Sequence, residues 1–184
     1  MPDTLDVALK EWDTVCRLLV EGRQVLLLRK GGISDVDGTF VMKHRRFLLF
    51  PTFVHQKGEL IQPWASDAFR PMDEEPADVR LPGWAEVTHV EQADDAAVQR
   101  LTDQHCWSEA QIDLRLNYRP GQPTYVALLR MHRLPEPVRV ANHGDYAGCV
   151  SWVPLHEAID LTGSEPALDD EAYGQACNKV LDVL

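Results

Sequence analysis

The chain has 184 residues and a mass of 20.8 kDa, which is the size of one ordinary domain. Hydrophobic residues make up 45% and charged residues 26%, and the mean hydropathy is −0.27, a composition typical of a globular protein rather than a disordered, collagen-like or membrane chain. Lys and Arg number 18 and Asp and Glu 29, so the net charge of −11 excludes a surface that is basic throughout, as proteins that coat nucleic acid need.

Features of targeting and of membrane insertion are missing from the sequence. No stretch approaches the roughly 20 consecutive apolar residues of a membrane-spanning helix. The first residues, Met-Pro-Asp-Thr-Leu-Asp, lack the basic flank and apolar run of a signal peptide. We therefore expect a cytoplasmic protein without membrane contact. Its four cysteines lie far apart, without a CxxC pair or zinc-type spacing, which predicts buried thiols: Cys16, Cys106, Cys149 and Cys177.

The first third of the chain predicts a helix and three strands. Residues 5–12 are expected to form a short helix, and the apolar segments 12–20 and 25–28, separated by Gly22, predict a strand, a turn and a strand. The run 25–28 is apolar on both faces, as in a central strand. The run 47–50 predicts a second central strand, which ends at Pro51.

The middle of the chain predicts a long loop followed by a helix. Four prolines interrupt residues 62–83, which predicts a surface excursion that acts as a lid or as a partner-facing loop. Apolar residues and His105 recur every four positions after Ala93, which predicts a helix over 92–106.

The last third predicts a hairpin, a strand and two helices. Strands over 111–116 and 125–132 are expected to pair through a Pro-Gly turn, and a short strand over 150–153 precedes a helix from Pro154 to about residue 161. An apolar stripe from Leu168 to Leu184 predicts a docked C-terminal helix. We expect a single α+β domain with a mixed, mainly antiparallel sheet flanked by helices.

Basic residues gather in the first third of the chain. Residues 1–60 contain nine Lys and Arg against eight Asp and Glu, whereas the rest contains nine against 21. If the strands 25–30 and 47–52 are neighbours, two basic groups meet at a Gly-Gly turn and form a phosphate site, in which a histidine is the candidate for proton transfer. The alternative is a solvated loop edge. The residues of the predicted phosphate site are Arg29, Lys30, Gly31, Gly32, Arg45, Arg46 and His55.

Acidic residues lie on and beside the predicted helix 92–106. Glu91, Asp95 and Asp103 fall on one helical face, where they could hold Mg²⁺, although their spacing matches no tight ligand motif. The alternative is that they complement the helix dipole and face solvent, together with Asp94. The Gly-rich turn over 144–148 is flexible enough to border a pocket, or is an ordinary connection. No P-loop, Rossmann glycine fingerprint, GxSxG or HExxH motif occurs.

Three segments carry a resemblance to a known family. They read Ala-Leu-Lys-Glu-Trp at 8–12, Leu-Leu-Leu-Arg-Lys-Gly-Gly-Ile at 26–33 and Phe-Leu-Leu-Phe-Pro-Thr-Phe-Val-His-Gln at 47–56. With these, the chain resembles the bacterial domain-of-unknown-function 1802 (DUF1802) family over nearly its whole length. The family brings no catalytic residues with it. Its occasional fusion to restriction-endonuclease-type domains implies, by association, a link to DNA processing.

The order of predicted elements also resembles that of Nudix hydrolases, which often carry a Trp-Val-Pro-Leu stretch like the one at 152–155. That resemblance implies a central helix whose glutamates bind Mg²⁺ and activate water. The best-matching stretch is 99–104, in which only Asp103 keeps an acidic side chain, so the implied box is degenerate.

The leading functional prediction is binding of a phosphate-bearing ligand, a nucleotide or a nucleic-acid end, at the basic cluster. The first alternative is a module without enzymatic activity that docks a protein partner through residues 62–83 and its acidic surface. The second is a degenerate Nudix-like pyrophosphohydrolase whose Mg²⁺-dependent release of phosphate would require Asp103. Whether the chain is an enzyme is left open at this stage.

Overall fold

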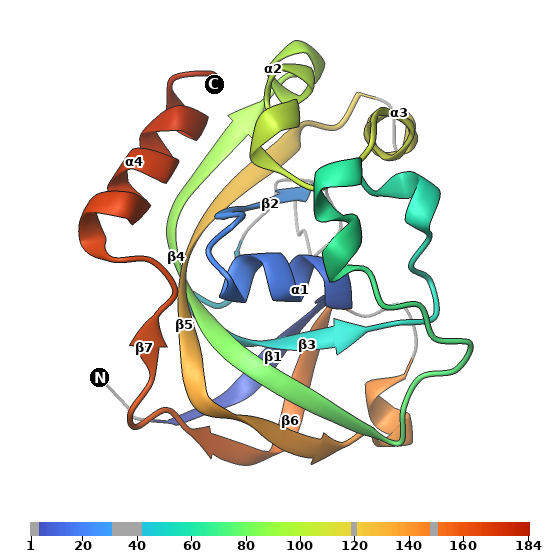
Figure 1. Cartoon of the computed structure of the whole chain (residues 1–184), viewed down its shortest axis with the longest axis vertical. Helices are drawn as coiled ribbons and strands as arrows, with labels where there is room; N and C mark the ends of the chain where they lie inside the picture. The colour runs from blue at the N-terminus through green and yellow to red at the C-terminus, as the bar shows by residue number, and fades with distance from the viewer. Residues whose placement is uncertain (1–3, 31–41, 119–120, 148–150) are drawn as a thin grey trace.

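A computed structural model describes residues 4–30, 42–118, 121–147 and 151–184, and its strands form one seven-stranded sheet (Figure 1). The strand order is β2-β5-β4-β3-β1-β6, and β7 pairs with β5. Only β1 and β3 run parallel among the described pairs, so the sheet is mixed and mainly antiparallel. The strands are β1 (Thr4–Trp12), β2 (Leu26–Arg29), β3 (Arg46–Thr52), β4 (Asp78–Ala93), β5 (Thr124–Ala141), β6 (Trp152–Asp160) and β7 (Glu165–Pro166).

Helices of both kinds complete the α+β fold that the sequence predicts. The α-helices are α1 (Asp13–Val20), α2 (Asp95–Arg100), α3 (Glu109–Asn117) and α4 (Asp170–Leu181). The 3₁₀ helices are η1 (Gly58–Leu60), η2 (Pro63–Ala68), η3 (Thr102–Gln104) and η4 (Gly144–Tyr146). Among the described residues, no helix is both long enough and apolar enough to cross a lipid bilayer.

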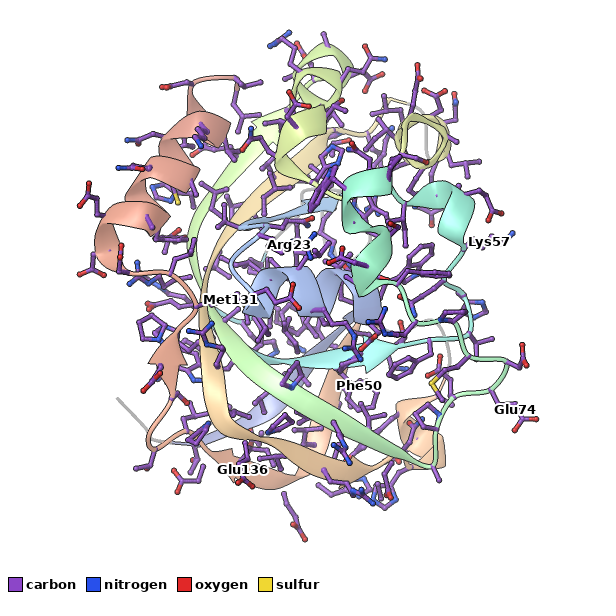
Figure 2. All side chains as sticks on the ribbon, in the orientation of Figure 1. Arg23, Phe50, Lys57, Glu74, Met131 and Glu136 are labelled. Carbon is purple, nitrogen blue, oxygen red and sulfur yellow. The ribbon has the colours of Figure 1, made fainter. Side chains whose placement is uncertain are left out.

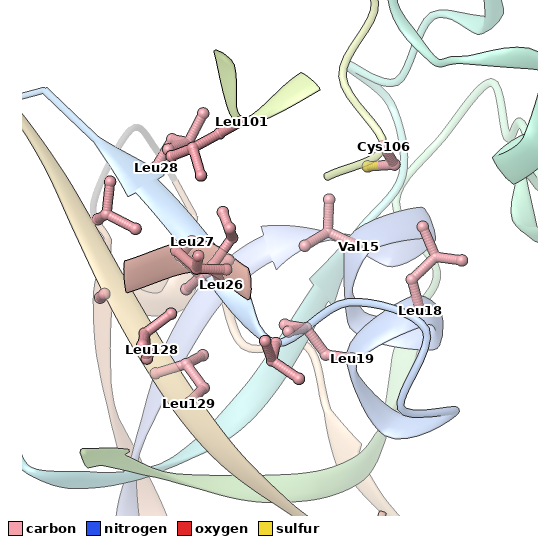
Figure 3. Packing of buried hydrophobic residues seen from close by; sticks show 14 of the residues in the cluster. Val15, Leu18, Leu19, Leu26, Leu27, Leu28, Leu101, Cys106, Leu128 and Leu129 are labelled. Atoms are coloured by element: carbon pink, nitrogen blue, oxygen red, sulfur yellow. The ribbon is translucent and has the colours of Figure 1, made fainter. Parts of the chain in front are cut away.

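Two hydrophobic cores lie on the two faces of β3, because successive side chains of a strand point to opposite faces. Phe47 and Leu49 belong to the larger core, in which the four α-helices pack with β2 and β5 (Figure 3). Leu48 and Phe50 belong to the smaller core, which the sheet strands enclose together with Tyr146 of η4. Three of the four cysteines, Cys16, Cys106 and Cys177, are free and buried, as predicted, and Cys149 lies outside the described residues.

The predictions for residues 5–20 are wrong in both parts, since a strand occupies residues 4–12 and a helix residues 13–20. The buried residues Val15, Leu18 and Leu19 follow a helical spacing. Gly22 has a φ of 73°, and the amide of Arg23 donates to the carbonyl of Leu18 at 2.9 Å. Gly22 is therefore the left-handed residue that ends α1, and it is not a hairpin turn.

The two doubly apolar runs are strands, but only one of them is central. β3 lies between β4 and β1, as predicted. β2 stands at the end of the strand order and pairs only with β5 among the described strands, so the prediction of a central position is wrong. The leucines of β2 are nevertheless buried, because they belong to the larger core, in which the α-helices cover them. The strands that carry Arg29 and Arg46 are therefore not neighbours, contrary to the prediction.

The middle of the chain contains more strand than predicted. The predicted excursion 62–83 holds η2 and then joins β4, which begins at Asp78. The predicted helix 92–106 is wrong over most of its length, because β4 continues to Ala93 and only the short helices α2 and η3 follow. Asp94 caps α2 by accepting a hydrogen bond from the amide of Ala97 at 2.7 Å, in keeping with the dipole interpretation.

Near the C-terminus, the predictions for residues 111–116 and 154–161 are wrong. α3 replaces the predicted strand, so the predicted hairpin does not form, and β5 pairs with β4 instead. β6 continues through Pro154 to Asp160, and its edge position tolerates a proline that lacks an amide donor. These two replacements also remove the Nudix-like order of elements. α4 confirms the predicted C-terminal helix.

Candidate ligand-binding site

A cavity of about 470 Å³ opens where the parallel strands β1 and β3 end. Lys10 pairs in register with Phe50 and Trp12 with Thr52, so these residues lie together at the ends of the two strands. The size is in the range of small-molecule sites. Five segments of the chain contribute its lining: Lys10, Glu11, Trp12, Arg29, Phe50, Thr52, His55, Glu75, Asn142, His143, Gly144, Tyr146 and Ala147.

Arg29, the last residue of β2, is held on the cavity wall by Glu11. Its Nη2 donates to Glu11 Oε2 at 2.8 Å, and the two side chains are 17% and 10% exposed. Glu11 Oε1 accepts from the amide of Trp12 at 2.9 Å, so the carboxylate is fixed from both oxygens. The Nε of Arg29 is buried and has no acceptor among the described residues. The guanidinium is thus oriented, and one of its donors has no acceptor in the described part of the chain.

Lys10 and Tyr146 join β1 to the turn after β5. The Lys10 Nζ donates to the Tyr146 carbonyl and lies 5.9 Å from the centroid of the Phe50 ring. Tyr146 is buried, and its hydroxyl accepts a hydrogen bond from the amide of His156 at 2.9 Å. Figure 2 shows Phe50 within the body of the molecule and Lys57 and Glu74 at its periphery. Because Phe50 and Tyr146 belong to the smaller core, the Lys10 ammonium lies at the boundary between that core and the cavity.

Two histidine rings lie close together, tilted by 31° to each other, beside the cavity. The centroids of the His143 and His156 rings are 4.4 Å apart, and His143 lines the cavity. His156 Nε2 lies 2.7 Å from Asp145 Oδ2, and this hydrogen bond holds the pKa of the Asp145 carboxyl below its usual value. The Gly-rich turn thus borders a pocket, which was one of the two predictions for it.

The loop after β3 carries His55 and is fixed by Glu75. Glu75 Oε1 accepts from the amides of Phe53 and Val54, at 2.9 and 3.0 Å. The exposed His55 follows directly and lines the cavity. Both cavity carboxylates, Glu11 and Glu75, therefore accept hydrogen bonds within the protein.

The predicted basic cluster is divided in the structure. Arg29 and His55 line the same cavity, whereas Arg45 and Arg46 lie at the opposite end of β3. Thr52 lies six positions after Arg46 along this strand, a distance of about 20 Å. The exposed Arg45 side chain pairs with Glu86 at 3.5 Å, and the Arg46 guanidinium lies 4.5 Å from the centroid of the Trp84 ring.

Lys30 points away from the cavity, although it follows Arg29 in the chain. Its buried side chain donates from Nζ to the carbonyl of Leu116 in α3. Gly31 and Gly32, predicted to form the anion-binding turn, lie outside the described residues.

The acidic residues proposed for Mg²⁺ do not share a helical face. Glu91 belongs to β4, Asp95 to α2 and the exposed Asp103 to η3. Within the described ranges, no group of three or more His, Cys, Asp or Glu side chains is arranged to hold a metal ion. The one-helix arrangement on which the magnesium prediction depended is therefore wrong.

Sequence reasoning missed most of the cavity wall. Lys10, Glu11 and Trp12 were assigned to a helix, which hid their register with β3. Asn142 and His143 follow a strand whose length was underestimated. The turn at 144–148 was the one available signal, and it indicated a pocket border without showing what faced it.

Comparisons with known proteins give one family and one group of solved structures. No curated protein matches the chain. Three crystal structures from Zymomonas mobilis are similar to it: the ASCH protein (TM-score 0.43, 14% identity, 94% of this chain and 93% of that chain), a serine-to-alanine variant (0.46, 14%, 97% and 99%) and a tyrosine-to-phenylalanine variant (0.47, 13%, 82% and 90%). Residues 8–179 match the family model described as a domain of unknown function, DUF1802, and the chain belongs to that family.

Proposed function

We propose that the cavity between the ends of β1 and β3 binds a phosphate-bearing ligand, a nucleotide or the end of a nucleic-acid strand. The observation that carries the proposal is the state of Arg29. Glu11 fixes its Nη2, while its buried Nε has no acceptor in the described part of the chain. Arginine presents paired donors in a rigid fork, and a phosphate oxygen satisfies such a donor with a strong, charge-assisted hydrogen bond.

The other basic groups of the cavity support the same ligand class. Lys10, His55 and His143 come from β1, from the loop after β3 and from the turn after β5, and they line one cavity with Arg29. Trp12 and Phe50 add apolar rings to this wall, which suits a ligand with a flat organic part. In a reaction at this site, His55 is the group that we assign to proton transfer to or from the phosphate.

Binding measurements with matched arginine variants test the proposal. Adenosine monophosphate, inorganic phosphate and a 5′-phosphorylated dinucleotide are titrated by calorimetry, with and without Mg²⁺. We expect Arg29→Gln to weaken binding of the tightest of these ligands at least tenfold, since it removes a charge-assisted contact worth about 1.5–3 kcal/mol. Arg45→Gln removes the same charge at the far end of β3 and is expected to change the affinity less than twofold.

A second variant separates loss of binding from loss of folding. Arg29→Gln leaves the Glu11 carboxylate without its cation, so its thermal midpoint is measured in parallel. His55 is exposed, and His55→Asn is expected to keep the wild-type midpoint and to weaken binding by about threefold or more. Equal affinities for the wild type, Arg29→Gln and His55→Asn, or an absence of binding by the whole panel, would refute the proposed site.

A further inference from the structure

A second cavity, of about 400 Å³, lies on the opposite face of β3 from the candidate site. Thr52 lines the first cavity, whereas Pro51 and Phe53 line the second, as the alternation of an extended chain requires. Residues of α1, β4 and β5 complete its wall. The lining residues are Asp13, Cys16, Arg17, Pro51, Phe53, Asp78, Arg80, Pro82 and Pro137.

The second cavity exists because β3 and β4 separate. The two strands pair only from Arg46–Glu86 to Leu48–Trp84, and the start of β4 then pairs with β5 alone among the described strands. A bulge lies between Leu81 and Gly83, where the backbone of β5 comes so close that a Cβ on Gly83 would lie 2.3 Å from the His132 carbonyl oxygen. In Figure 1, β3 and β4 diverge toward the end of β3, and α1 lies next to β3.

One part of this wall is apolar and offers few hydrogen bonds. Pro51, Pro82 and Pro137 have no amide hydrogen, so the backbone provides no donor at these three positions. The ring of Phe53 adds apolar surface next to them. This part of the wall is suited to the hydrocarbon body of a ligand.

The charged part of the wall has one arginine that is not paired. Arg17 Nε lies 2.6 Å from the buried Asp13 carboxylate, and Arg139 Nη1 lies 3.4 Å from Asp78. Arg80 makes no ion pair or side-chain hydrogen bond with any described residue. It also stands directly opposite Arg139 in the β4–β5 register, and like charges in that position repel. An anion at Arg80 would relieve this repulsion.

We propose that this second cavity binds a small organic monoanion, a carboxylate attached to an apolar body. Arg80 holds the carboxylate, and Phe53 and the three prolines contact the body. We assign a single negative charge to the ligand, because Arg80 is the one cation of this wall without an ion pair to a described residue.

Three small probes separate the two parts of this proposal. Phenylacetate has both the charge and the ring, acetate has only the charge, and 2-phenylethanol has only the ring. We expect phenylacetate to bind at least tenfold more tightly than either of the others, as followed by NMR titration of the full chain. An absence of phenylacetate binding up to about 10 mM, or equal binding of the three probes, overturns the proposal.

Two arginine variants test the position of the carboxylate. Arg80 and Arg133 are both exposed and lie on paired strands, but only Arg80 lines the cavity. Arg80→Gln should weaken phenylacetate binding at least fivefold, and Arg133→Gln less than twofold. Equal effects would show that only the general charge of the protein matters, which contradicts the proposal.

The same titrations keep the two sites distinguishable. Arg29→Gln, which affects the first cavity, should leave phenylacetate binding unchanged, and Arg80→Gln should leave nucleotide binding unchanged. Loss of phenylacetate binding in Arg29→Gln, in a sample that circular dichroism shows to be folded, would place the probe in the first cavity and overturn the second site.

Discussion

At the scale of single residues, the structure distinguishes charged side chains that are buried in contacts within the protein from charged side chains that line a cavity. Lys30 looks like part of a phosphate loop in the sequence, but its ammonium is buried against the carbonyl of Leu116. Arg29, its neighbour, is fixed at one nitrogen, and another of its nitrogens lacks an acceptor among the residues that the structure describes. Residue type alone predicts both as anion ligands, because the direction of a side chain depends on strand pairing that only the folded chain defines.

The buried His105 gives a pH prediction at this scale. Burial lowers the pKa of its imidazole from 6.5 to about 4, and the charge of Arg115 adds to this effect. Between pH 4 and pH 6.5, His105 therefore binds fewer protons in the folded state than in the unfolded state. The stability that the neutral His105 contributes is fully present above pH 6.5 and is lost as the pH decreases toward 4. His105 should account for a loss of about 2 kcal/mol between pH 7 and pH 5.

Chemical unfolding at the two pH values measures this contribution. In His105→Asn, the difference in unfolding free energy between pH 7 and pH 5 should shrink by about 2 kcal/mol, whatever the stability of the variant at pH 7. His55→Asn removes an exposed histidine and should keep the wild-type difference. The same pH difference in both variants would show that His105 is not the responsible group.

At the scale of elements, the errors of prediction share a physical cause. Residues 111–116 alternate apolar and polar side chains like a strand, yet they form α3, in which Leu114 is 60% exposed. Residues 154–161 begin with a proline that suits a helix, yet they pair with β1. Tertiary packing decided both cases, whereas β3 and α4, whose patterns agree with their packing, were predicted correctly.

Two glycine substitutions test the packing of these elements with opposite signs. Gly83→Ala places a Cβ 2.3 Å from the His132 carbonyl oxygen, so it should destabilise the fold by about 2 kcal/mol or more. Gly174→Ala lies in α4 with no heavy atom within 4 Å of the added Cβ, and it should stabilise the fold by about 0.5–1 kcal/mol. Denaturant midpoints measure both, and a neutral Gly83→Ala would contradict the close approach of β4 and β5.

At the scale of the whole molecule, the order of the predicted strands and helices led to the correct α+β class and the correct mainly antiparallel sheet. It could not predict the cavities, because each is assembled from segments far apart in the sequence. Lys10 and Tyr146, for example, are 136 positions apart and share a hydrogen bond. The strand order that brings such residues together follows from the packing of both cores and leaves no local pattern in the chain.

The net charge of −11 gives a prediction about ligand size. Long-range repulsion opposes a polyanion, whereas a mononucleotide carries few charges into the site. We expect a 5′-phosphorylated 12-mer to bind no more tightly than adenosine monophosphate in low salt, and to gain affinity relative to it as salt increases. Fluorescence anisotropy at several salt concentrations measures the ratio of the two affinities. A 12-mer that binds much more tightly than adenosine monophosphate in low salt would contradict the prediction.

The placement of β1 has a consequence for the order in which the chain can fold. β1 lies between β3 and β6, so β1 acquires its second neighbour only when residues 152–160 have been made. Until then, one edge of β1 has no backbone partner from β6, and pairing across so long a loop is slow. Completion of the sheet around β1 therefore waits for the synthesis of β6, and a nascent chain that stops before Trp152 would leave β1 open to pairing with another molecule.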